Sequence, residues 1–401
     1  MQDKPIFSDI QSAIDDITNG KMVIVVDDED RENEGDLVMA AHYATPDAIN
    51  FMIKHAKGLV CVPVTKDILQ RFELEQMVKQ NKDTFKTAFS VSFDAASQFG
   101  VTTGISAFDR AKSIQVFINP NSTKEDIVTP GHLFPLEAKV MGVLKRSGHT
   151  EAAVDLARLA GLEPAGVICE IIKSNGEMAR IPDLKSFAKK HQLNMITIKD
   201  LIQFRIKNER FIEKVETVDL PTDFGQFRLT CYKDIINDKF HFALTLGDFA
   251  KDKTLVRVHS ECITGDVFGS LRCDCGPQLG SAMEMVAKNG SGVVLYMSQE
   301  GRGLGIANKL KAYKLQEDGY DTVEANKALG FGSDLRDYGV GAQILIDLGI
   351  KEIDLITNNP RKIVGLEGYG LKVRNRIPIV MSPGKYNQQY LSTKKKKLGH
   401  M

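Results

Sequence analysis

The stretch that decides how this chain is interpreted reads Arg257-Val-His-Ser-Glu-Cys262-Ile-Thr-Gly-Asp-Val-Phe-Gly-Ser-Leu-Arg272-Cys273-Asp-Cys275-Gly276. Its cysteines are spaced Cys-x10-Cys-x-Cys, and three thiolates can hold a tetrahedral zinc ion whose fourth position stays open. The next histidine downstream is His400, so the short spacing of a zinc ribbon is not met. Neighbouring arginines favour thiolates. The pattern predicts catalytic zinc; three buried or free cysteines are the alternative.

Regular elements surround this stretch. We expect strands at 224–232, 240–246, 254–259 and 292–298, and a helix at 277–288. The turn Gln299-Glu-Gly-Arg-Gly-Leu-Gly-Ile306 follows the last of these strands and is of a kind that can cradle phosphates. It lacks the Gly-Lys-Ser/Thr of a P-loop and has the wrong spacing for a dinucleotide-binding turn.

A second unusual segment lies near the start of the chain. Asp27-Asp-Glu-Asp-Arg-Glu-Asn-Glu-Gly-Asp36 carries seven acidic residues and one arginine, between the apolar runs 22–26 and 37–41. Repulsion among so many carboxylates is unfavourable unless cations or hydrogen bonds offset it. Oxygen ligands suit Mg2+, which keeps waters for a substrate. The segment is therefore either a metal-binding loop or an exposed acidic turn, and its spacing is not that of an EF-hand.

Other polar features sit between expected helices and strands. Residues 8–20 predict a helix that Ser8 can cap. Thr129-Pro-Gly-His132-Leu-Phe-Pro135 predicts a rigid turn, and Arg146-Ser-Gly-His149-Thr-Glu151 predicts a loop before a helix. Loops pinned by Gly and Pro that carry Arg and His are typical of phosphate and metal handling. Glu170 lies in an apolar strand, where a carboxylate is costly unless it is paired or functional.

Length and composition limit the possible functions. The chain has 401 residues, is 43% hydrophobic, and balances 52 basic against 52 acidic residues. Zero net charge argues against a general nucleic-acid or membrane-surface binder. Six scattered and clustered cysteines do not form a disulfide framework. Without a signal-peptide pattern or a long apolar run, a soluble cytoplasmic protein with no membrane partner is expected.

The length favours more than one domain. A charged helix is expected at 199–214, and the domain boundary is expected within or just after it. Residues 205–214 have the charge of an exposed connector, although Phe211 and Ile212 can dock on one half. We predict a mixed α+β or α/β fold, with two catalytic domains at 1–205 and 206–401, each a mixed sheet with flanking helices.

These motifs resemble two known families. Residues 1–205 resemble 3,4-dihydroxy-2-butanone 4-phosphate synthase through the acidic segment, the Thr129–Pro135 segment and the Arg146–Glu151 segment, with Ser147 where many synthases have glycine. Residues 206–401 resemble GTP cyclohydrolase II through the cysteine stretch, Glu300-Gly-Arg302, Tyr313, Asp334-Leu-Arg336-Asp and Thr357-Asn-Asn-Pro-Arg-Lys362. Together they resemble the bifunctional enzymes of riboflavin biosynthesis.

The resemblance of the first half implies conversion of ribulose 5-phosphate into 3,4-dihydroxy-2-butanone 4-phosphate and formate, with Mg2+ or Mn2+. It implies that Glu32 and His149 hold the metal and that His132 and Glu170 take part in catalysis. It also implies a homodimer with active sites near the subunit interface. The positions that it assigns to substrate binding are Arg31, Glu32, Asp36, Arg146, Ser147, Gly148, His149, Thr150 and Glu170.

The resemblance of the second half implies hydrolysis of GTP to 2,5-diamino-6-(5-phosphoribosylamino)pyrimidin-4(3H)-one, formate and pyrophosphate. Cys262, Cys273 and Cys275 would hold Zn2+, and Mg2+ would accompany the GTP phosphates. Asp334 matches a proton acceptor, Arg336 a nucleophile toward the α-phosphate, and Tyr313 a catalytic tyrosine. A protonated guanidinium is a poor nucleophile, so the role of Arg336 stays open. The positions matching GTP contacts are Arg257, Val258, His259, Ser260, Glu261, Gln278, Glu300, Gly301, Arg302, Thr322, Thr357 and Lys362.

Two alternatives remain. One is a zinc-bearing nucleotide-binding or regulatory protein without catalysis, which would need neither the Asp334 and Arg336 pair nor His132 and Glu170. The other is an enzyme in which only one half is active. The basic tail at 394–397 is either a solvated end or a phosphate contact.

Overall fold

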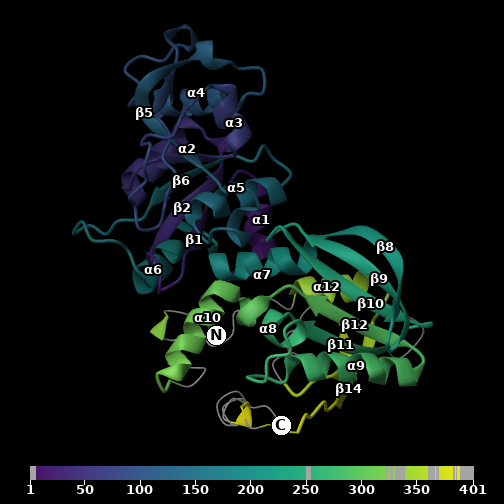
Figure 1. The fold of residues 1–401 in the computed structure, drawn as a ribbon. Coiled ribbons are helices and arrows are strands. Elements are labelled where there is room, and N and C mark those ends of the chain that lie inside the picture. Colours follow the sequence, from purple (N-terminus) through teal and green to yellow (C-terminus); the bar gives the residue numbers. More distant parts are fainter. Residues whose placement is uncertain are drawn as a thin grey trace, which may run out of the picture. The chain divides into compact units, whose positions relative to one another are not determined.

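The structure is a computed structural model that describes residues 6–249, 254–320, 324–325, 328–329, 339–359, 366, 370–382, 384 and 386–388 (Figure 1). The chain divides into two compact units, Met1–Arg205 and Ile206–Met401. Each unit is built around its own sheet, so each is described separately below.

The described part of the first unit holds a seven-stranded mixed sheet in the order β4-β5-β3-β6-β2-β1-β7. Its strands are β1 Val23–Val26, β2 Gly35–Ala40, β3 Cys61–Val64, β4 Phe93–Ala95, β5 Ile127–Glu137, β6 Gly166–Glu170 and β7 Met195–Thr197. The β1/β7 and β3/β5 pairs are parallel, while the β1/β2, β2/β6, β3/β6 and β4/β5 pairs are antiparallel.

Helices cover both faces of this sheet. Side chains of α1 Ile10–Thr18, α5 His149–Leu159 and α7 Ile198–Asn208 pack on one face, and those of α2 Pro46–Phe51, α3 Lys66–Arg71, α4 Ala107–Ile118 and α6 Ile181–His191 on the other. Strand β1 shows why: Val23 and Val25 face the first layer, Ile24 and Val26 the second. Alternating side chains buried on both sides give the continuous apolar run seen in the sequence. Shorter helical turns are η1 Ala41–Tyr43, η2 Met52–Ala56, η3 Ser97–Phe99, η4 Lys124–Asp126 and η5 Gly142–Leu144.

The strand register places three predicted site residues in one row. Asp36 pairs directly with Glu170 across β2 and β6. Cys61, the first residue of β3, pairs with Ile168 of β6 and with Phe134 of β5, so Glu170 and His132 each lie two residues from a position paired with Cys61. Strands lie about 4.8 Å apart, which puts His132 roughly 10 Å from Glu170 along the row. The sheet thus brings these polar residues to the level of the amino-terminal end of β3.

The described part of the second unit also holds a seven-stranded mixed sheet, in the order β14-β13-β11-β12-β10-β9-β8. Its strands are β8 Ile212–Thr222, β9 Gly225–Asp234, β10 Lys239–Leu246, β11 Thr254–Ser260, β12 Gly292–Met297, β13 Glu352–Ile356 and β14 Lys372–Ile377. Strands β11, β12, β13 and β14 run parallel to their neighbours in that group. Their carboxyl ends therefore share one edge, where open α/β sheets bind ligands.

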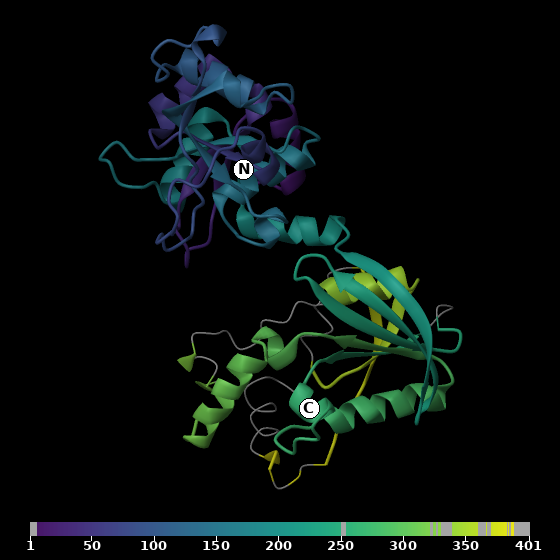
Figure 2. The same cartoon turned by 45° about the horizontal axis from the view of Figure 1, so that its top comes forward.

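The helices of the second unit are α8 Ile263–Asp266, α9 Cys275–Asn289, α10 Ile306–Glu317 and α12 Gly339–Asp347, with the short turn η6 Glu300–Gly303. Helix α9 lies along one face of the sheet (Figure 2), where Ala282 and Val286 pack against Val294. Val340 and Ile344 of α12 pack on the opposite layer with Val256 and Leu295. The predicted mixed fold with two helix-flanked sheets is confirmed.

Two sequence-based expectations about elements were wrong, and one strand was missed. The Thr129–Pro135 segment is part of strand β5 rather than a turn, because β3 and β4 pair with it and override its Pro and Gly signals. Helix α1 is capped by Asp9, which accepts from the Ser12 amide at 2.9 Å, whereas Ser8 donates to Asn194. Strand β8 was missed because it is an edge strand with mostly exposed side chains.

The connector after Arg205 is docked rather than free. Helix α7 ends at Asn208 instead of continuing to residue 214. Gln343 of α12 donates to the Ile206 and Glu209 carbonyls at 3.1 and 2.7 Å and accepts from the Phe211 amide at 2.9 Å. Phe211 and Ile212 are buried. The alternative in which they dock on one half is confirmed, and that half is the second unit.

Candidate active sites

The acidic segment forms an ordered loop between β1 and β2. The buried carboxylate of Asp27 accepts from the amides of Glu32 at 3.1 Å and Glu34 at 2.8 Å. Arg31 donates to Asp27 and to the Oε2 atom of Glu32, both at 2.7 Å. Hydrogen bonds and one guanidinium thus offset part of the repulsion between carboxylates. The loop is not a plain solvated turn.

His149 begins α5 and reaches this loop. Its Nε2 atom lies 3.1 Å from the Val25 carbonyl, so Nε2 carries a proton and donates. Its Nδ1 atom lies 3.7 Å from Oε2 of Glu32 and 3.9 Å from Oδ2 of Asp36. A ligand oxygen or nitrogen of each of Asp27, Glu32 and His149 falls within 4.8 Å of the others, which is a spacing that suits a metal ion. The structure therefore brings the two predicted metal ligands together.

Burial and charge shift the protonation of this cluster. Burial, reinforced by Glu170, Glu32 and Glu34, raises the pKa of Asp36 to about 7 despite His149. Burial lowers the pKa of His149, but Asp36 and Glu32 outweigh it and raise that pKa to about 9. The Oδ1 atom of Asp36 is buried and has no hydrogen-bond partner among the described residues. A buried oxygen without a protein partner, beside a carboxylate and an imidazole, is a position that a cation, a water or a substrate hydroxyl can fill.

The predicted phosphate loop leads into the same cluster. Arg146 donates to Glu151 at 2.6 Å, to the Thr87 hydroxyl at 3.0 Å and to the Phe85 carbonyl at 3.1 Å. Gly148 precedes α5, and a Cβ atom there would lie 2.3 Å from the Arg146 guanidinium. Ser147 is exposed, while Gly148 and Thr150 are buried. The amino terminus of α5 thus lies at the cluster of Asp27, Glu32 and His149, and its amides are of a kind that suits an anion.

The two predicted catalytic residues of the first unit are fixed differently. The Oε2 atom of Glu170 accepts from the Leu59 amide at 2.8 Å. His132 is half-exposed on β5, and its Nδ1 atom lies 2.7 Å from Oδ2 of Asp94, whose Oδ1 atom accepts from the His132 amide at 3.0 Å. Asp94 therefore orients the imidazole, and sequence reasoning missed this residue.

In the second unit the three predicted zinc ligands converge. The Sγ atoms of Cys262, Cys273 and Cys275 lie within 4.8 Å of one another, and those of Cys262 and Cys273 are 3.6 Å apart. A tetrahedral zinc ion with Zn–S bonds of about 2.3 Å separates its sulfurs by about 3.8 Å, so the donor set fits. A Cβ atom on Gly265 would lie 2.9 Å from the Cys273 sulfur, so this glycine lets the loop approach.

The carboxylate of Asp266 organises the backbone at Cys262. It accepts from the Cys262 amide at 2.9 Å and from the Tyr296 hydroxyl at 3.0 Å, and it lies 3.1 Å from His259. Arg257 and Gln278 are buried and hydrogen-bond to each other at 2.6 Å, and Gln278 donates to Asp274 at 2.6 Å. Two predicted GTP contacts thus brace the cysteine loop.

Lys309 of α10 interacts with the cysteine loop and with Glu300 of the turn η6. Its ammonium lies 3.1 Å from the Cys262 sulfur and 2.9 Å from both the Thr264 hydroxyl and Oε1 of Glu300. It also lies 5.6 Å from the ring centre of Tyr313, whose hydroxyl is 3.4 Å from that of Thr264. Lys309 was missed, although its i, i+4 spacing to Tyr313 could have indicated a shared helix face.

The remaining predicted GTP contacts fall into two groups. Ser260 is the last residue of β11 and Glu261 follows it, Glu300 and Gly301 come after β12, and Thr357 follows β13. All of them lie at the carboxyl ends of the parallel strands. Val258 is buried in the core and contributes no exposed side chain. Thr322, Asp334, Arg336, Lys362 and the side chain of Arg302 lie outside the described residues.

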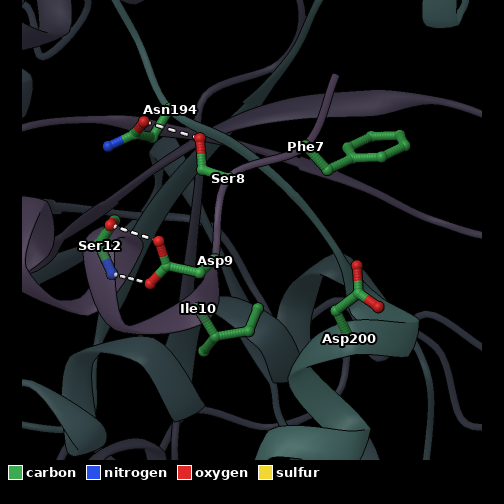
Figure 3. A pocket seen from close by; sticks show the side chains of 7 residues that line it. All are labelled: Phe7, Ser8, Asp9, Ile10, Ser12, Asn194 and Asp200. Carbon is green, nitrogen blue, oxygen red and sulfur yellow. Dashed lines mark hydrogen bonds between the residues drawn. The ribbon is translucent and has the colours of Figure 1, made fainter. Parts of the chain in front are cut away.

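A separate hollow lies at the amino terminus of α1 (Figure 3). It is lined by Phe7, Ser8, Asp9, Ile10, Ser12, Asn194 and Asp200. Asp9 is engaged as the helix cap with Ser12, and Ser8 with Asn194. None of the described lining residues is basic, and two of them, Asp9 and Asp200, are acidic.

No helix in the part of the chain described here is both long enough and apolar enough to span a bilayer.

Comparisons with known proteins match each unit to a different family. Residues 11–204 match the family 3,4-dihydroxy-2-butanone 4-phosphate synthase, and residues 213–378 match GTP cyclohydrolase II. The riboflavin biosynthesis protein RibBA of Aquifex aeolicus is 58% identical over 397 residues, covering 98% of each chain. That of Bacillus mycoides is 56% identical over 397 residues, covering 99% of each.

A solved structure is similar over both units. The two-domain 3,4-dihydroxy-2-butanone 4-phosphate synthase RibBX of A. baumannii is 40% identical, with a TM-score of 0.68, and covers 92% of this chain and 99% of its own. The chain therefore belongs to the bifunctional riboflavin biosynthesis family, with a 3,4-dihydroxy-2-butanone 4-phosphate synthase domain, a lyase, followed by a GTP cyclohydrolase II domain, a hydrolase.

Proposed function

We propose that the unit Met1–Arg205 converts ribulose 5-phosphate into 3,4-dihydroxy-2-butanone 4-phosphate and formate, and that the unit Ile206–Met401 releases formate and pyrophosphate from GTP. The observation that supports this most strongly is the presence of one metal-type donor cluster in each unit. Because neither reaction makes the substrate of the other, nothing has to pass between the sites.

In the first unit, Glu32 and His149 would hold Mg2+ or Mn2+, whose charge stabilises an enediolate of the sugar. Support comes from the Nδ1 atom of His149, which faces Glu32 while Nε2 donates to the Val25 carbonyl. Asp36, with its orphan oxygen, would bind a substrate hydroxyl. Arg31, Arg146 and the amides from Ser147 to Thr150 would bind the phosphate.

His132 and Glu170 would move protons on the sugar carbons. Both lie near the level of the amino-terminal end of β3, and side chains that start roughly 10 Å apart can both contact a substrate bound between them. Asp94 fixes the proton of His132 on Nδ1, so Nε2 is left to accept a proton. Glu170 is held by the Leu59 amide.

In the second unit, Cys262, Cys273 and Cys275 would hold zinc, which when bound supplies a water that is acidic near neutral pH. Glu300, fixed by the Ile263 amide at 2.6 Å and by Lys309, would contact the guanine or its attacking water. Tyr313 would orient the substrate from α10. Asp334 would accept a proton, and Arg336 would contact the α-phosphate. The remaining predicted positions would contact GTP, and Mg2+ would bind its phosphates.

We also propose a homodimer in the cytoplasm. The exposed apolar side chains of Ile105 and Phe108, which follow the glycine that contacts Asp94 and His132, favour a second copy of this chain near the synthase site. Sedimentation velocity tests this: a dimer at micromolar concentration is expected, and a Phe108→Asp chain should sediment as a monomer.

The direct test of metal assignment uses the purified full chain. One zinc ion per chain is expected by elemental analysis. A chelator should stop formate release from ribulose 5-phosphate, and added Mg2+ or Mn2+ should restore it. Metal-independent turnover of ribulose 5-phosphate, or a zinc-free protein that hydrolyses GTP, would contradict the proposal.

A further inference from the structure

Arg180 caps the amino terminus of α6 and reaches the acidic loop. Its Nη1 atom donates to the carbonyl of Glu32 at 2.8 Å and also, at close range, to the carbonyl of Asn33. The same atom lies 3.9 Å from Oε1 of Glu34. Arg180 therefore contacts the backbone of the predicted metal ligand, whereas His149 lies beside its carboxylate.

The backbone of Glu32 is held at both ends. Its amide donates to the buried Asp27 at 3.1 Å, and its carbonyl accepts from Arg180 at 2.8 Å. The next residue, Asn33, has φ +54°, which turns the chain sharply there. An arginine can donate to two carbonyls at once, so Arg180 satisfies the oxygens of both Glu32 and Asn33 at this left-handed turn.

Contacts of its own helix also hold Arg180 in place. Its amide donates to Asp183 at 3.1 Å, and Leu184 of the same helix is fully buried. A Cβ atom on Gly35 would lie 2.5 Å from Leu184, so α6 packs directly against the glycine that opens β2. Helix α6 and its capping residue thus contact the loop twice, through Leu184 at Gly35 and through Arg180 at the Glu32 carbonyl.

We propose that Arg180 is a positioning residue for the divalent metal of the synthase site. It holds the Glu32 carboxylate toward His149, and it places a positive charge beside Glu34 in a loop of seven carboxylates. This inference rests on the proposed role of Glu32 as a metal ligand. Loss of a residue that orients a metal ligand weakens metal binding by about 10- to 100-fold.

The test measures Mn2+ binding to the full chain in the absence of substrate, with electron paramagnetic resonance as the readout. Arg180→Ala is expected to weaken binding at this site about 10-fold, and Arg180→Lys, which keeps the charge but cannot reach both carbonyls, by less. Lys185→Ala removes a charge from an exposed position on the same helix and should leave binding unchanged. At saturating Mn2+ the kcat of Arg180→Ala should return close to that of the wild type, which a misfolded site would not allow.

Two results separate the possible failures. If Glu32→Gln binds Mn2+ as tightly as the wild type, the proposed metal site itself is wrong. If Glu32→Gln loses binding but Arg180→Ala and Arg180→Lys retain wild-type affinity, the metal site stands and the positioning role of Arg180 is overturned. A kcat of Arg180→Lys that stays low at every Mn2+ concentration would also overturn it.

Discussion

The Oδ2 atom of Asp94 lies 2.7 Å from the Nδ1 atom of His132, and the other oxygen of Asp94 accepts from the His132 amide at 3.0 Å. A carboxylate that hydrogen-bonds to both the ring and the backbone amide of His132 fixes the orientation of the imidazole. It also fixes which ring nitrogen carries the proton. Gly104 packs against both side chains, since a Cβ atom there would lie 2.0 Å from Asp94 and 2.5 Å from His132.

Asp94→Asn should lower the synthase kcat by about 100-fold, because an amide can donate to Nδ1 and leave the wrong tautomer for general-base chemistry. The KM for ribulose 5-phosphate should change little, since Asp94 is not a substrate ligand in this account. Asp47→Asn, an exposed acid on α2, is the control. A wild-type kcat for Asp94→Asn would mean that His132 needs no orienting partner.

Gly265→Ala should weaken zinc binding about 10-fold. The added methyl would sit 2.9 Å from the Cys273 sulfur and 3.2 Å from the Cys262 sulfur, which forces the donors apart. The measurement is zinc release to a chromogenic chelator. Gly280→Ala, in the middle of α9 with its nearest neighbour at 3.4 Å, should release zinc like the wild type. Equal release by both variants would show that the donor loop tolerates the methyl group.

Arg205→Ala should destabilise the first unit by about 3 kcal/mol, because it leaves a buried carboxylate without its partner. Arg205 is 3% exposed and donates to Asp155 and to the Met141 carbonyl, both at 2.7 Å. Urea unfolding, monitored by circular dichroism, measures the loss. Arg158→Ala, on the more exposed neighbour of Asp155, should cost much less.

The pH dependence of this variant has a definite sign. Burial raises the pKa of Asp155, although Arg205 and the Val143 amide lower it. Removing Arg205 raises that pKa further. A carboxyl group whose folded-state pKa is raised contributes stability below its unfolded pKa and loses it as pH rises through the folded pKa. The deficit of Arg205→Ala should therefore be largest near neutral pH and shrink on acidification; a deficit that grows would contradict the pairing.

Two overlapping fragments, 1–208 and 206–401, should each fold and keep their own reaction. The first retains Arg205, which braces the loop before Arg146, and the second retains the Ile206 and Glu209 carbonyls that Gln343 binds. Cooperative unfolding and formate release from each substrate are the measurements. Folded fragments that are active only after mixing would indicate a site shared between the units.

Much of this organisation follows from local sequence. Buried strands such as β1 and β12 are continuous apolar runs, and the cysteine spacing alone indicates a metal site. What local sequence could not supply is pairing. The Thr129–Pro135 segment looks like a turn until β3 and β4 lie beside it, and Asp94 has no signal before β4 brings it to His132. No sequence pattern marks Arg180 either, because it reaches the acidic loop only through the packing of Leu184 on Gly35.

The central claim is that each unit carries one complete and separate catalytic site. The most direct test measures formate from ribulose 5-phosphate and from GTP, supplied one at a time, for the full-length Glu32→Gln and Cys273→Ser variants. Glu32→Gln should release formate only from GTP, and Cys273→Ser only from ribulose 5-phosphate. Loss of both reactions in either folded variant, or retention of both, would contradict the account.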